Sequence, residues 1–368
     1  MSVKLLVIAG ARPNFMKVAP LWAALSPDPQ FLLKLVHTGQ HYDYAMSGQF
    51  FEELGLPQPD YHLEAGSGSH AQQTAEILKR LEPVLIAEKP AAIVVVGDVN
   101  STLAGALAAK KLGIDVIHVE AGLRSLDRSM PEEINRLATD AISDLFLVTE
   151  ESGRYNLLRE GAPPERIHMV GNLMIDSLHG HLKQALQSDA RSRLIQGEAE
   201  RQFGLITLHR PANVDHEGQL AQILMALDEI SQEVPLYWPV HPRTRAKLQG
   251  LTYSKEIHLL EPLGYLDFLS LQAQSTVVLT DSGGIQEETT VLGVPCLTIR
   301  ENTERPVTIE CGTNRLAGTT RSSILKAWRE LRDEPQKERK IPPFWDGKAG
   351  ERCHAVLSQY FLTPVERG

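Results

Sequence analysis

The chain has 368 residues, of which 42% are hydrophobic and 23% charged; this length predicts two domains, and this composition is typical of a globular enzyme. The formal net charge of −9 argues against a general binder of nucleic acid, and the 6% content of aromatic residues argues against base-stacking platforms. The three cysteines are an odd set without metal-ligand spacing, so we expect no disulfide framework, no metal site and a cytoplasmic protein.

The first apolar run, residues 3–9, is followed at once by Gly10, which predicts a buried strand and not a signal peptide. No run reaches the roughly 18 apolar residues that cross a bilayer, so we expect no membrane association. Further apolar runs without alternation are separated by helical patterns, which is typical of a parallel sheet covered on both faces.

In the first half, strands are expected at 3–9, 32–37, 92–96, 115–119, 144–148 and 167–170, with helices near 16–25, 46–54, 72–88, 101–111, 132–143 and 151–160. The pattern then restarts, with strands at 203–208, 236–240, 257–260, 276–280 and 295–299 and helices near 218–232, 243–249, 265–274 and 284–292. The tail at 350–361 has helical spacing.

This order of elements predicts an α/β protein with two Rossmann-like, doubly wound domains that face a central cleft. We expect a first domain over residues 1–171 and a second over 172–354, with a last helix near 355–368 packing back on the first. Ligands of open parallel sheets bind beyond the carboxyl ends of the strands, so each candidate motif is judged by whether it follows a strand.

The segment Asp281-Ser282-Gly283-Gly284 lies between a buried strand and a helix. Glycines allow close backbone approach, and the free N–H groups of a helix start attract an anion such as phosphate. An ordinary helix cap without a ligand is the alternative. Glu288, one turn later on the same helix face, could accept hydrogen bonds from the vicinal hydroxyls of a ribose.

The turn after the first strand carries Arg12, and Lys17 follows one helical turn later. Such cations near a helix N-terminus could clamp phosphate oxygens, although solvated surface cations are an equal alternative. The turn has neither the GxGxxG nor the P-loop pattern, which disfavours a nicotinamide or Walker-type site.

Asp98 and Glu120 end two buried strands, and Glu132 with Glu133 opens the next helix. Two carboxylates at adjacent strand ends suit proton transfer, because burial can raise the pKa of a carboxyl group towards neutrality. An acidic residue in a first helical turn can also simply complement the helix dipole.

In the second half, His209 and His241 each follow a strand, and Arg305 comes after the strand at 295–299. An isolated histidine is more often structural than catalytic, but the same placement recurs in both halves of the chain. The spacing of these histidines does not fit a metal site.

Ten segments together resemble the UDP-N-acetylglucosamine 2-epimerase family, mostly its non-hydrolysing branch. In chain order between residues 10 and 308 they are GARPNFMKVAPL, HTGQH, VVGDVNSTLAG, HVEAGLRS, PEEINR, GNLMIDSL, LHRPANVD, PVHPRT, LTDSGGIQEE and ENTERPVT. The resemblance covers about nine-tenths of the chain. It implies a glycosyltransferase-B-like fold, a homodimer, and a role in making cell-surface polysaccharide.

The family's chemistry implies that UDP-GlcNAc and UDP-ManNAc are interconverted through elimination of UDP to 2-acetamidoglucal and re-addition of UDP, without cofactor or metal. By motif, the catalytic residues would be Asp98, Glu120, Glu132 and His209. The residues that would bind the UDP-sugar are Arg12, Lys17, His241, Phe268, Ser282, Gly283, Gly284, Glu288 and Arg305, with Phe268 beside the uracil.

The chain departs from many bacterial members at Tyr42-Asp43, at Ala71 and at Pro211-Ala212. The resemblance assigns these positions to an activating UDP-GlcNAc site, so we expect weak or no activation by substrate. The same departures leave open an epimerase of a UDP-2,3-diacetamido-uronic acid. A hydrolysing epimerase that releases ManNAc and UDP, a glycosyltransferase and a sugar-nucleotide sensor also stay open on the sequence.

Overall fold

The computed structural model describes residues 2–39, 51–195, 202–333 and 340–362. The chain divides into two compact units: unit 1 is Met1–Ser177 with Pro343–Gly368, and unit 2 is Leu178–Pro342. The first boundary of this division lies six residues beyond residue 171, and the return to unit 1 begins before residue 355. Each unit has its own parallel sheet, and each is described separately below.

Unit 1 contains a seven-stranded sheet in the order β3-β2-β1-β4-β5-β6-β7, with all neighbours parallel. The strands are β1 (Val3–Ala9), β2 (Phe31–His37), β3 (Tyr61–His62), β4 (Ala92–Val96), β5 (Asp115–Val119), β6 (Leu145–Val148) and β7 (Ile167–Met169). Its helices are α1 (Arg12–Leu25), α3 (His70–Glu88), α4 (Asn100–Lys111), α5 (Pro131–Ile142), α6 (Glu151–Arg159), η1 (Pro164–Arg166), the start of α7 (Leu173–Leu186) and α16 (Ala349–Leu362).

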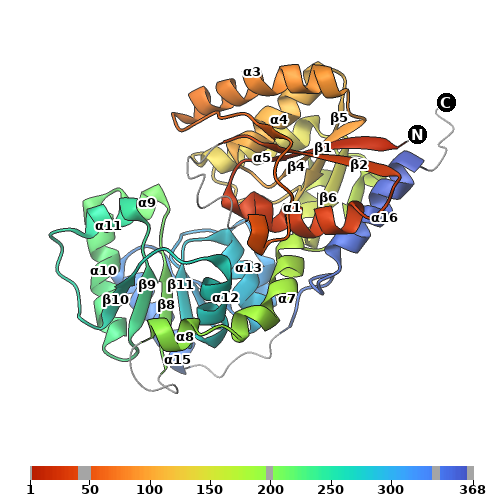
Figure 1. Cartoon of the computed structure of the whole chain (residues 1–368). Coiled ribbons are helices and arrows are strands. Elements are labelled where there is room, and N and C mark those ends of the chain that lie inside the picture. Colours follow the sequence, from red (N-terminus) through yellow and green to blue (C-terminus); the bar gives the residue numbers. More distant parts are fainter. Residues whose placement is uncertain (1, 40–50, 196–201, 334–339, 363–368) are drawn as a thin grey trace. The chain divides into compact units, whose positions relative to one another are not determined.

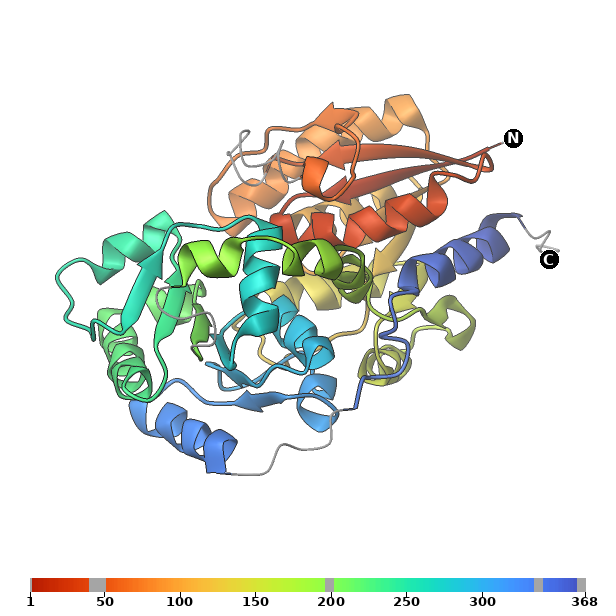
Figure 2. The same ribbon diagram turned by 60° about the horizontal axis from the view of Figure 1, so that its bottom comes forward.

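Helices cover both faces of this sheet (Figure 1). Helices α3, α4 and α5 lie on one face, and α1 and α16 lie on the other. Figure 2 shows α16, although it is the last helix described, beside α1 near the start of the chain. Asp176 fixes the start of α16 by accepting hydrogen bonds from the amides of Ala349 at 3.0 Å and Gly350 at 2.7 Å. The C-terminal helix is therefore part of unit 1.

Unit 2 contains a six-stranded parallel sheet in the order β10-β9-β8-β11-β12-β13. The strands are β8 (Gly204–Thr207), β9 (Leu236–Pro239), β10 (Ile257–Leu260), β11 (Val277–Thr280), β12 (Cys296–Thr298) and β13 (Asn314–Leu316). After the rest of α7, the helices are α8 (Ala190–Leu194), α9 (Pro211–Val214), α10 (Glu217–Ser231), α11 (Pro242–Leu248), α12 (Tyr265–Gln274), α13 (Gly283–Leu292), α14 (Val307–Glu310) and α15 (Arg321–Asp333).

The expected fold class is confirmed, because both sheets are parallel and alternate with helices. In each sheet the strand order reverses once, between β1 and β4 in unit 1 and between β8 and β11 in unit 2. Loops diverge at such a reversal, and ligands bind there. The reversals therefore mark the place in each sheet, at the carboxyl ends of the strands, where functional side chains are expected.

Several elements were not expected from the sequence, among them β3, β13 and α15. Strands β3 and β13 have two and three residues, which is too short for an apolar run to be recognised. Helix α15 is mostly polar and buries only a narrow stripe that includes Ile324 and Trp328. Residues 46–50 of the helix expected at 46–54 lie outside the described residues.

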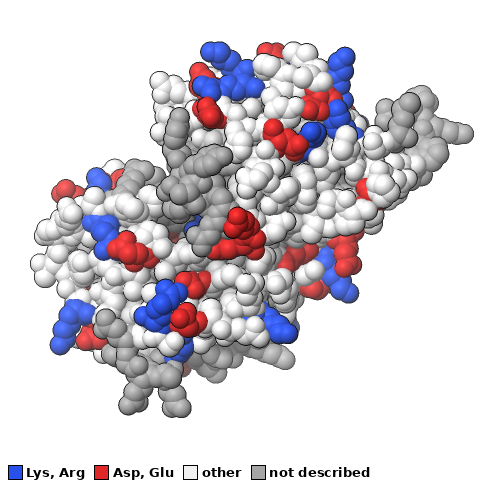
Figure 3. All heavy atoms as spheres, viewed as in Figure 1, with Lys and Arg blue, Asp and Glu red and all other residues white. Residues whose placement is uncertain are grey.

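Acidic and basic side chains are interspersed on the face of the molecule shown in Figure 3. Within the described ranges, no helix is both long and apolar enough to span a bilayer.

The turn after β5 packs backbone against backbone, because a Cβ added at Gly122 would overlap the Gly153 carbonyl, and Gly122 has φ +82°. We expect Gly122→Ala to lower the free energy of unfolding by about 3 kcal/mol, since both strain and overlap act. Gly113→Ala, at φ +73° with open space, should cost about 1 kcal/mol. Urea denaturation followed by circular dichroism measures both, and equal losses would show that the overlap is relieved without cost.

Candidate functional site

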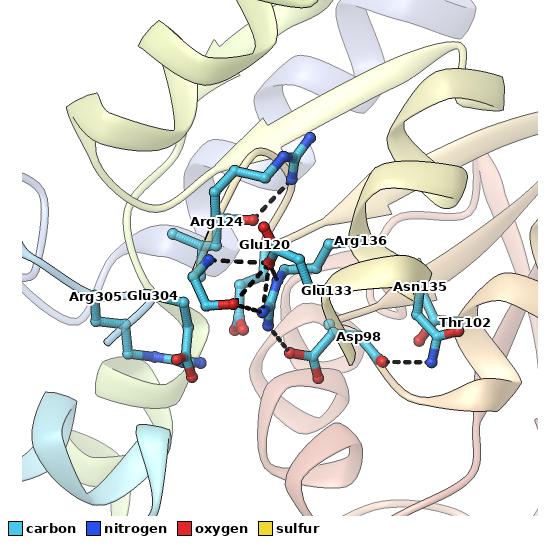
Figure 4. Close-up of polar contacts among 12 residues, drawn as sticks. Asp98, Thr102, Glu120, Arg124, Glu133, Asn135, Arg136, Glu304 and Arg305 are labelled. Atoms are coloured by element: carbon cyan, nitrogen blue, oxygen red, sulfur yellow. Dashed lines mark hydrogen bonds and ion pairs between the residues drawn. The ribbon is translucent and has the colours of Figure 1, made fainter. Parts of the chain in front are cut away.

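In unit 1, polar side chains gather where β4 and β5 end (Figure 4). These strands are neighbours, with Val96 paired to Val119, so the following residues Asp98 and Glu120 lie at the same sheet edge. Glu120 has φ +68°, a left-handed conformation that is costly for a residue with a side chain. Such strain is found mainly where function requires a side chain in a particular place.

Lys17, from the second turn of α1, forms an ion pair with the carboxylate of Glu120. The two side chains are only 6% and 3% exposed. An ion pair this deeply buried holds both side chains in place, because separating them would leave a buried charge without a partner. The predicted contact of Lys17 with phosphate stays a prediction, and its observed partner is a carboxylate.

Asp98 pairs instead with Arg136, from the middle of α5. Arg136 also donates from Nε and Nη2 to Glu133, at 2.9 and 2.7 Å. Burial would raise the pKa of Glu133, but hydrogen bonds from the Ser125 amide and from Arg136 hold this pKa below its ordinary value. Arg136 is thus a fixed cation between a buried carboxylate and Asp98, whose side chain remains 25% exposed.

Two asparagines hold the backbone at this edge. Asn135 donates to the carbonyl of Asp98 at 2.9 Å, and Asn14 donates to the carbonyl of Val96 at 2.9 Å. The side-chain oxygen of Asn14 accepts from the amides of Gly10 and Ala11, at 3.2 and 3.1 Å. The turns after β1 and β4 are therefore tied together, which fixes the direction in which Asp98 leaves the sheet.

Beneath this edge, His118 and Asp140 form a fully buried pair at 2.6 Å. The second ring nitrogen of His118 faces the Gly97 carbonyl at 2.8 Å, so each ring nitrogen lies against an oxygen acceptor. Asp140 also contacts Arg124 at 2.7 Å and accepts from the Gly122 amide at 3.0 Å. One buried network therefore braces the turns that carry both Asp98 and Glu120.

In unit 2, His209 follows β8 and Asp281 follows the adjacent strand β11. The His209 ring lies with Nδ1 at 2.9 Å from the Asp281 carboxylate; the histidine side chain is 59% exposed and Asp281 is fully buried. Burial would raise the pKa of Asp281, but hydrogen bonding and charge from His209 hold it below its ordinary value. Asp281 is thus a buried anion behind an exposed imidazole.

The predicted anion-binding turn is the N-terminus of α13, which begins at Gly283. Ser282 is the N-cap residue, but its side chain makes no capping hydrogen bond. A Cβ at Gly283 would overlap Arg305, so the guanidinium group lies directly against the turn. Arg305 donates to Glu287 at 2.6 Å and to Glu304 at 2.5 Å. Its predicted contact with phosphate stays a prediction.

Glu304 is the centre of a group of three arginines. Its carboxylate contacts Arg305, Arg300 at 2.8 Å and, at 3.8 Å, Arg210. Burial would raise the pKa of Glu304, but the charges of Arg305 and Arg300 hold it far below its ordinary value. Arg305 also pairs with the buried Glu287, so three guanidinium groups and two buried carboxylates lie beside the start of α13.

The remaining predicted residues lie as follows. Arg12 is exposed at the first position of α1, and His241 is exposed after β9. Glu132 is half-buried in the first turn of α5 and has no ion-pair or hydrogen-bond partner in the part of the chain that the structure describes. Phe268 is partly buried and packs on the hydrophobic core of unit 2.

Gly284 lies in the first turn of α13, and Glu288 is buried one turn later, where it accepts a hydrogen bond from the Tyr265 hydroxyl at 3.1 Å. The predicted residues thus divide between the two units, with Asp98, Glu120 and Lys17 close together in unit 1 and His209, the α13 turn and Arg305 in unit 2. Tyr42 and Asp43 lie outside the described residues, whereas Ala71 lies in the first turn of α3.

Sequence reasoning did not find Arg136, Asn135, Glu304 or the carboxylate role of Asp281. The i, i+3 spacing of Glu133 and Arg136 was a usable signal, because such residues are neighbours on a helix. The pairing of Asp281 with His209 joins positions 72 residues apart and is visible only once strands β8 and β11 are known to be neighbours.

The arrangement can transfer protons and hold an anion. Unit 1 presents carboxylates with different partners, Asp98 with Arg136 and Glu120 with Lys17, and unit 2 presents a histidine beside an anion-attracting helix start. Among the residues described, no group of three or more histidine, cysteine, aspartate or glutamate side chains is placed to hold a metal ion.

The Asp140 network gives a test of the electrostatics. The folded-state pKa of Asp140 lies below the ordinary 3.8, because the charges of His118 and Arg124 overcome burial. Its stabilising effect is therefore complete above pH 3.8 and is lost as pH falls below that value. Asp140→Asn should lower the free energy of unfolding by about 3–5 kcal/mol at pH 7, with a smaller deficit at about pH 3.

The matched control is Asp189→Asn, because Asp189 has a 76% exposed side chain and a long, 3.4 Å pair with Arg193. This change should leave the unfolding curve unaltered at either pH. A deficit for Asp140→Asn that is the same at neutral and at acidic pH would contradict the charged network.

The sequence matches the family described as UDP-N-acetylglucosamine 2-epimerase over residues 23–358. A UDP-N-acetylglucosamine 2-epimerase of Methanocaldococcus jannaschii is 43% identical over 97% of this chain and 99% of that protein. A UDP-2,3-diacetamido-2,3-dideoxy-D-glucuronate 2-epimerase of Pseudomonas aeruginosa is 43% identical over 89% of this chain and 92% of that protein.

The fold agrees with solved structures. The crystal structure of the M. jannaschii enzyme in complex with UDP-GlcNAc and UDP has a TM-score of 0.90 and covers 97% of this chain and 99% of that chain, at 43% identity. The Neisseria meningitidis enzyme bound to UDP-GlcNAc has a TM-score of 0.87 at 30% identity, covering 98% and 100%. The chain belongs to the UDP-N-acetylglucosamine 2-epimerase family.

Proposed function

We propose that this protein is a non-hydrolysing UDP-N-acetylglucosamine 2-epimerase that interconverts UDP-GlcNAc and UDP-ManNAc. The observation that carries the proposal is the set of acidic groups that unit 1 presents after β4, after β5 and in the first turn of α5. Asp98 pairs with Arg136, Glu120 pairs with Lys17 in a strained backbone conformation, and Glu132 is half-buried without a partner among the described residues. A binding protein has no need of three carboxylates in such different surroundings.

The proposed reaction is an anti elimination followed by an addition. A carboxylate takes the proton from C2 while the bond from C1 to the diphosphate oxygen breaks, which leaves 2-acetamidoglucal and UDP. The diphosphate oxygen then attacks C1, and C2 receives a proton on its other face. The C2 proton is only weakly acidic, so its removal must be coupled to stabilisation of the departing diphosphate.

Unit 2 supplies groups suited to that diphosphate. The start of α13 offers backbone N–H groups at Gly283 and Gly284, the Ser282 hydroxyl is not used for capping, and Arg305 lies against the turn. In the proposal Glu288 binds the ribose and Phe268 packs beside the uracil, while Arg12, Lys17 and His241 complete the binding of the UDP-sugar. The reaction needs no redox cofactor and no metal.

The proposal places the enzyme in the cytoplasm as a homodimer that supplies UDP-ManNAc for cell-surface polysaccharide. This part rests on the family resemblance. The P. aeruginosa relative supports a second candidate substrate, a UDP-2,3-diacetamido-uronic acid, because it reaches the same 43% identity as the M. jannaschii enzyme, over 89% of this chain against 97%.

Proton NMR of the purified protein with UDP-GlcNAc in D2O tests the reaction. We expect UDP-ManNAc to form and both epimers to gain deuterium at C2. The carboxylate that takes the C2 proton exchanges it with D2O, so the group that protonates C2 returns deuterium. The parallel sample contains the UDP-2,3-diacetamido-uronic acid, and faster turnover there would favour the second substrate. Free ManNAc with UDP would identify a hydrolysing enzyme, and protium retained at C2 of the product would exclude the elimination route.

The Ser282 hydroxyl gives a second test, because the anion site must hold UDP after the bond breaks. Ser282→Ala should release more 2-acetamidoglucal and UDP per turnover than the unaltered enzyme, about tenfold for one lost hydrogen bond to a charged group. The control is Ser231→Ala in the same unit, whose hydroxyl donates to the Asp228 carbonyl at 2.8 Å. A variant that is slower without extra release would show that Ser282 does not retain the intermediate.

A further inference from the structure

The imidazole of His209 has two nitrogens in different surroundings. Nδ1 lies 2.9 Å from the carboxylate of Asp281. Nε2 has no hydrogen-bond partner among the described residues, and the side chain is 59% exposed. A neutral imidazole carries one proton, on either nitrogen, and the hydrogen bond made by one nitrogen decides the state of the other.

The Asp281 carboxylate is itself held in place by several hydrogen-bond donors. It accepts from the His209 amide at 3.1 Å, from the Arg210 amide at 2.9 Å and from the Asn213 side chain at 3.1 Å. These partners are all donors, so the carboxylate is an acceptor that the fold has fixed before any ligand binds. A fixed acceptor facing Nδ1 requires a proton on Nδ1.

The same contacts tie the histidine to the anion-binding turn. Arg210 donates from Nε to the Asp281 carbonyl at 2.9 Å, and the hydroxyls of Thr207 and Thr280 lie 2.7 Å apart. Asp281 is also the residue immediately before Ser282, the N-cap of α13. The distance between the imidazole and the start of α13 is therefore set by rigid local structure within unit 2.

We propose that Asp281 is a positioning residue for His209, which holds the imidazole in the tautomer protonated on Nδ1 and so presents Nε2 to the substrate beside the diphosphate turn. This role differs from the helix-capping or anion-binding role that the DSGG sequence alone indicates. It rests on the proposed function, in which His209 acts on the UDP-sugar.

The tautomer of His209 can be determined by NMR in the unaltered enzyme. Protein labelled with ¹⁵N-histidine is examined at about pH 9, where an ordinary imidazole is neutral, and the His209 signals are identified by their absence in His209→Asn. We expect a protonated Nδ1 and an unprotonated Nε2. The opposite tautomer, or an even mixture of the two, would overturn the proposal without any variant of Asp281 having to fold.

Kinetics then separate positioning from simple support of the fold. Asp281→Asn should lower kcat by about 10²- to 10⁴-fold, since an Asp-to-Asn change behind a histidine gives the wrong tautomer while leaving geometry intact, and should change KM less than about threefold. In the His209→Asn background the same change should alter kcat less than about threefold, because residues that act as one unit are not additive. Equal losses in both backgrounds would overturn the proposal.

The control is Asp228→Asn, because Asp228 also accepts a backbone amide in unit 2, from Ser254 at 2.7 Å, without contacting His209. It should leave the His209 signals and kcat unchanged. If the unaltered enzyme does not turn over either UDP-sugar, the proposed function fails, while the NMR result still decides the tautomer. If His209→Asn is slow and Asp281→Asn is not, only the positioning role fails.

Discussion

Ionised carboxylates at the ends of buried strands are the constraint on which both sheet edges depend. Leaving such a charge buried and unpaired costs more than the net stability of most proteins can tolerate. This protein meets the constraint at Glu120 with an ammonium group and at Asp281 with amides and an imidazole. Glu304 is paired with guanidinium groups. Each solution brings a donor to a fixed place, so the arrangement that allows folding also orders the functional groups.

The choice of partner gives each carboxylate a different chemistry. Asp98 and Glu133 share the planar guanidinium group of Arg136, whereas Glu120 is paired with the compact ammonium group of Lys17. An epimerase that removes and returns a proton on opposite faces of one carbon needs groups that differ in this way. The pairs seen in unit 1 are consistent with that need.

Most of the fold could be predicted from the sequence, because buried parallel strands are continuous apolar runs. β4 and β5 begin and end where AIVVV and DVIHV do. Residues such as Asp98 and His209 could be singled out for the same reason, since a polar residue directly after an apolar run is conspicuous. Strand β13 could not be predicted, because three residues at a sheet edge carry no recognisable period.

The partners of the candidate residues were largely beyond sequence reasoning. Lys17 resembled a phosphate ligand because helix starts attract anions, but its ammonium pairs with a carboxylate that follows a strand far along the chain. The sequence indicates only that Asp281 belongs to a glycine-containing turn. The pairing of β11 with β8 brings it beside His209. The local sequence indicates which residues follow a strand at its carboxyl end. Only the strand order determines which of these residues lie side by side.

Helix α16 has a consequence for how the protein is made. It lies on α1, with its first amides held by Asp176, and Trp345 just before it donates to the Thr149 carbonyl at 3.0 Å. All of unit 2 is translated between Asp176 and these residues. During synthesis, unit 2 can therefore fold before unit 1 is complete, while the surface of unit 1 that α16 covers, including part of α1, stays exposed until residues 349–362 leave the ribosome. A chaperone that shields apolar surface would therefore be needed for the longest time by unit 1, although most of unit 1 is translated first.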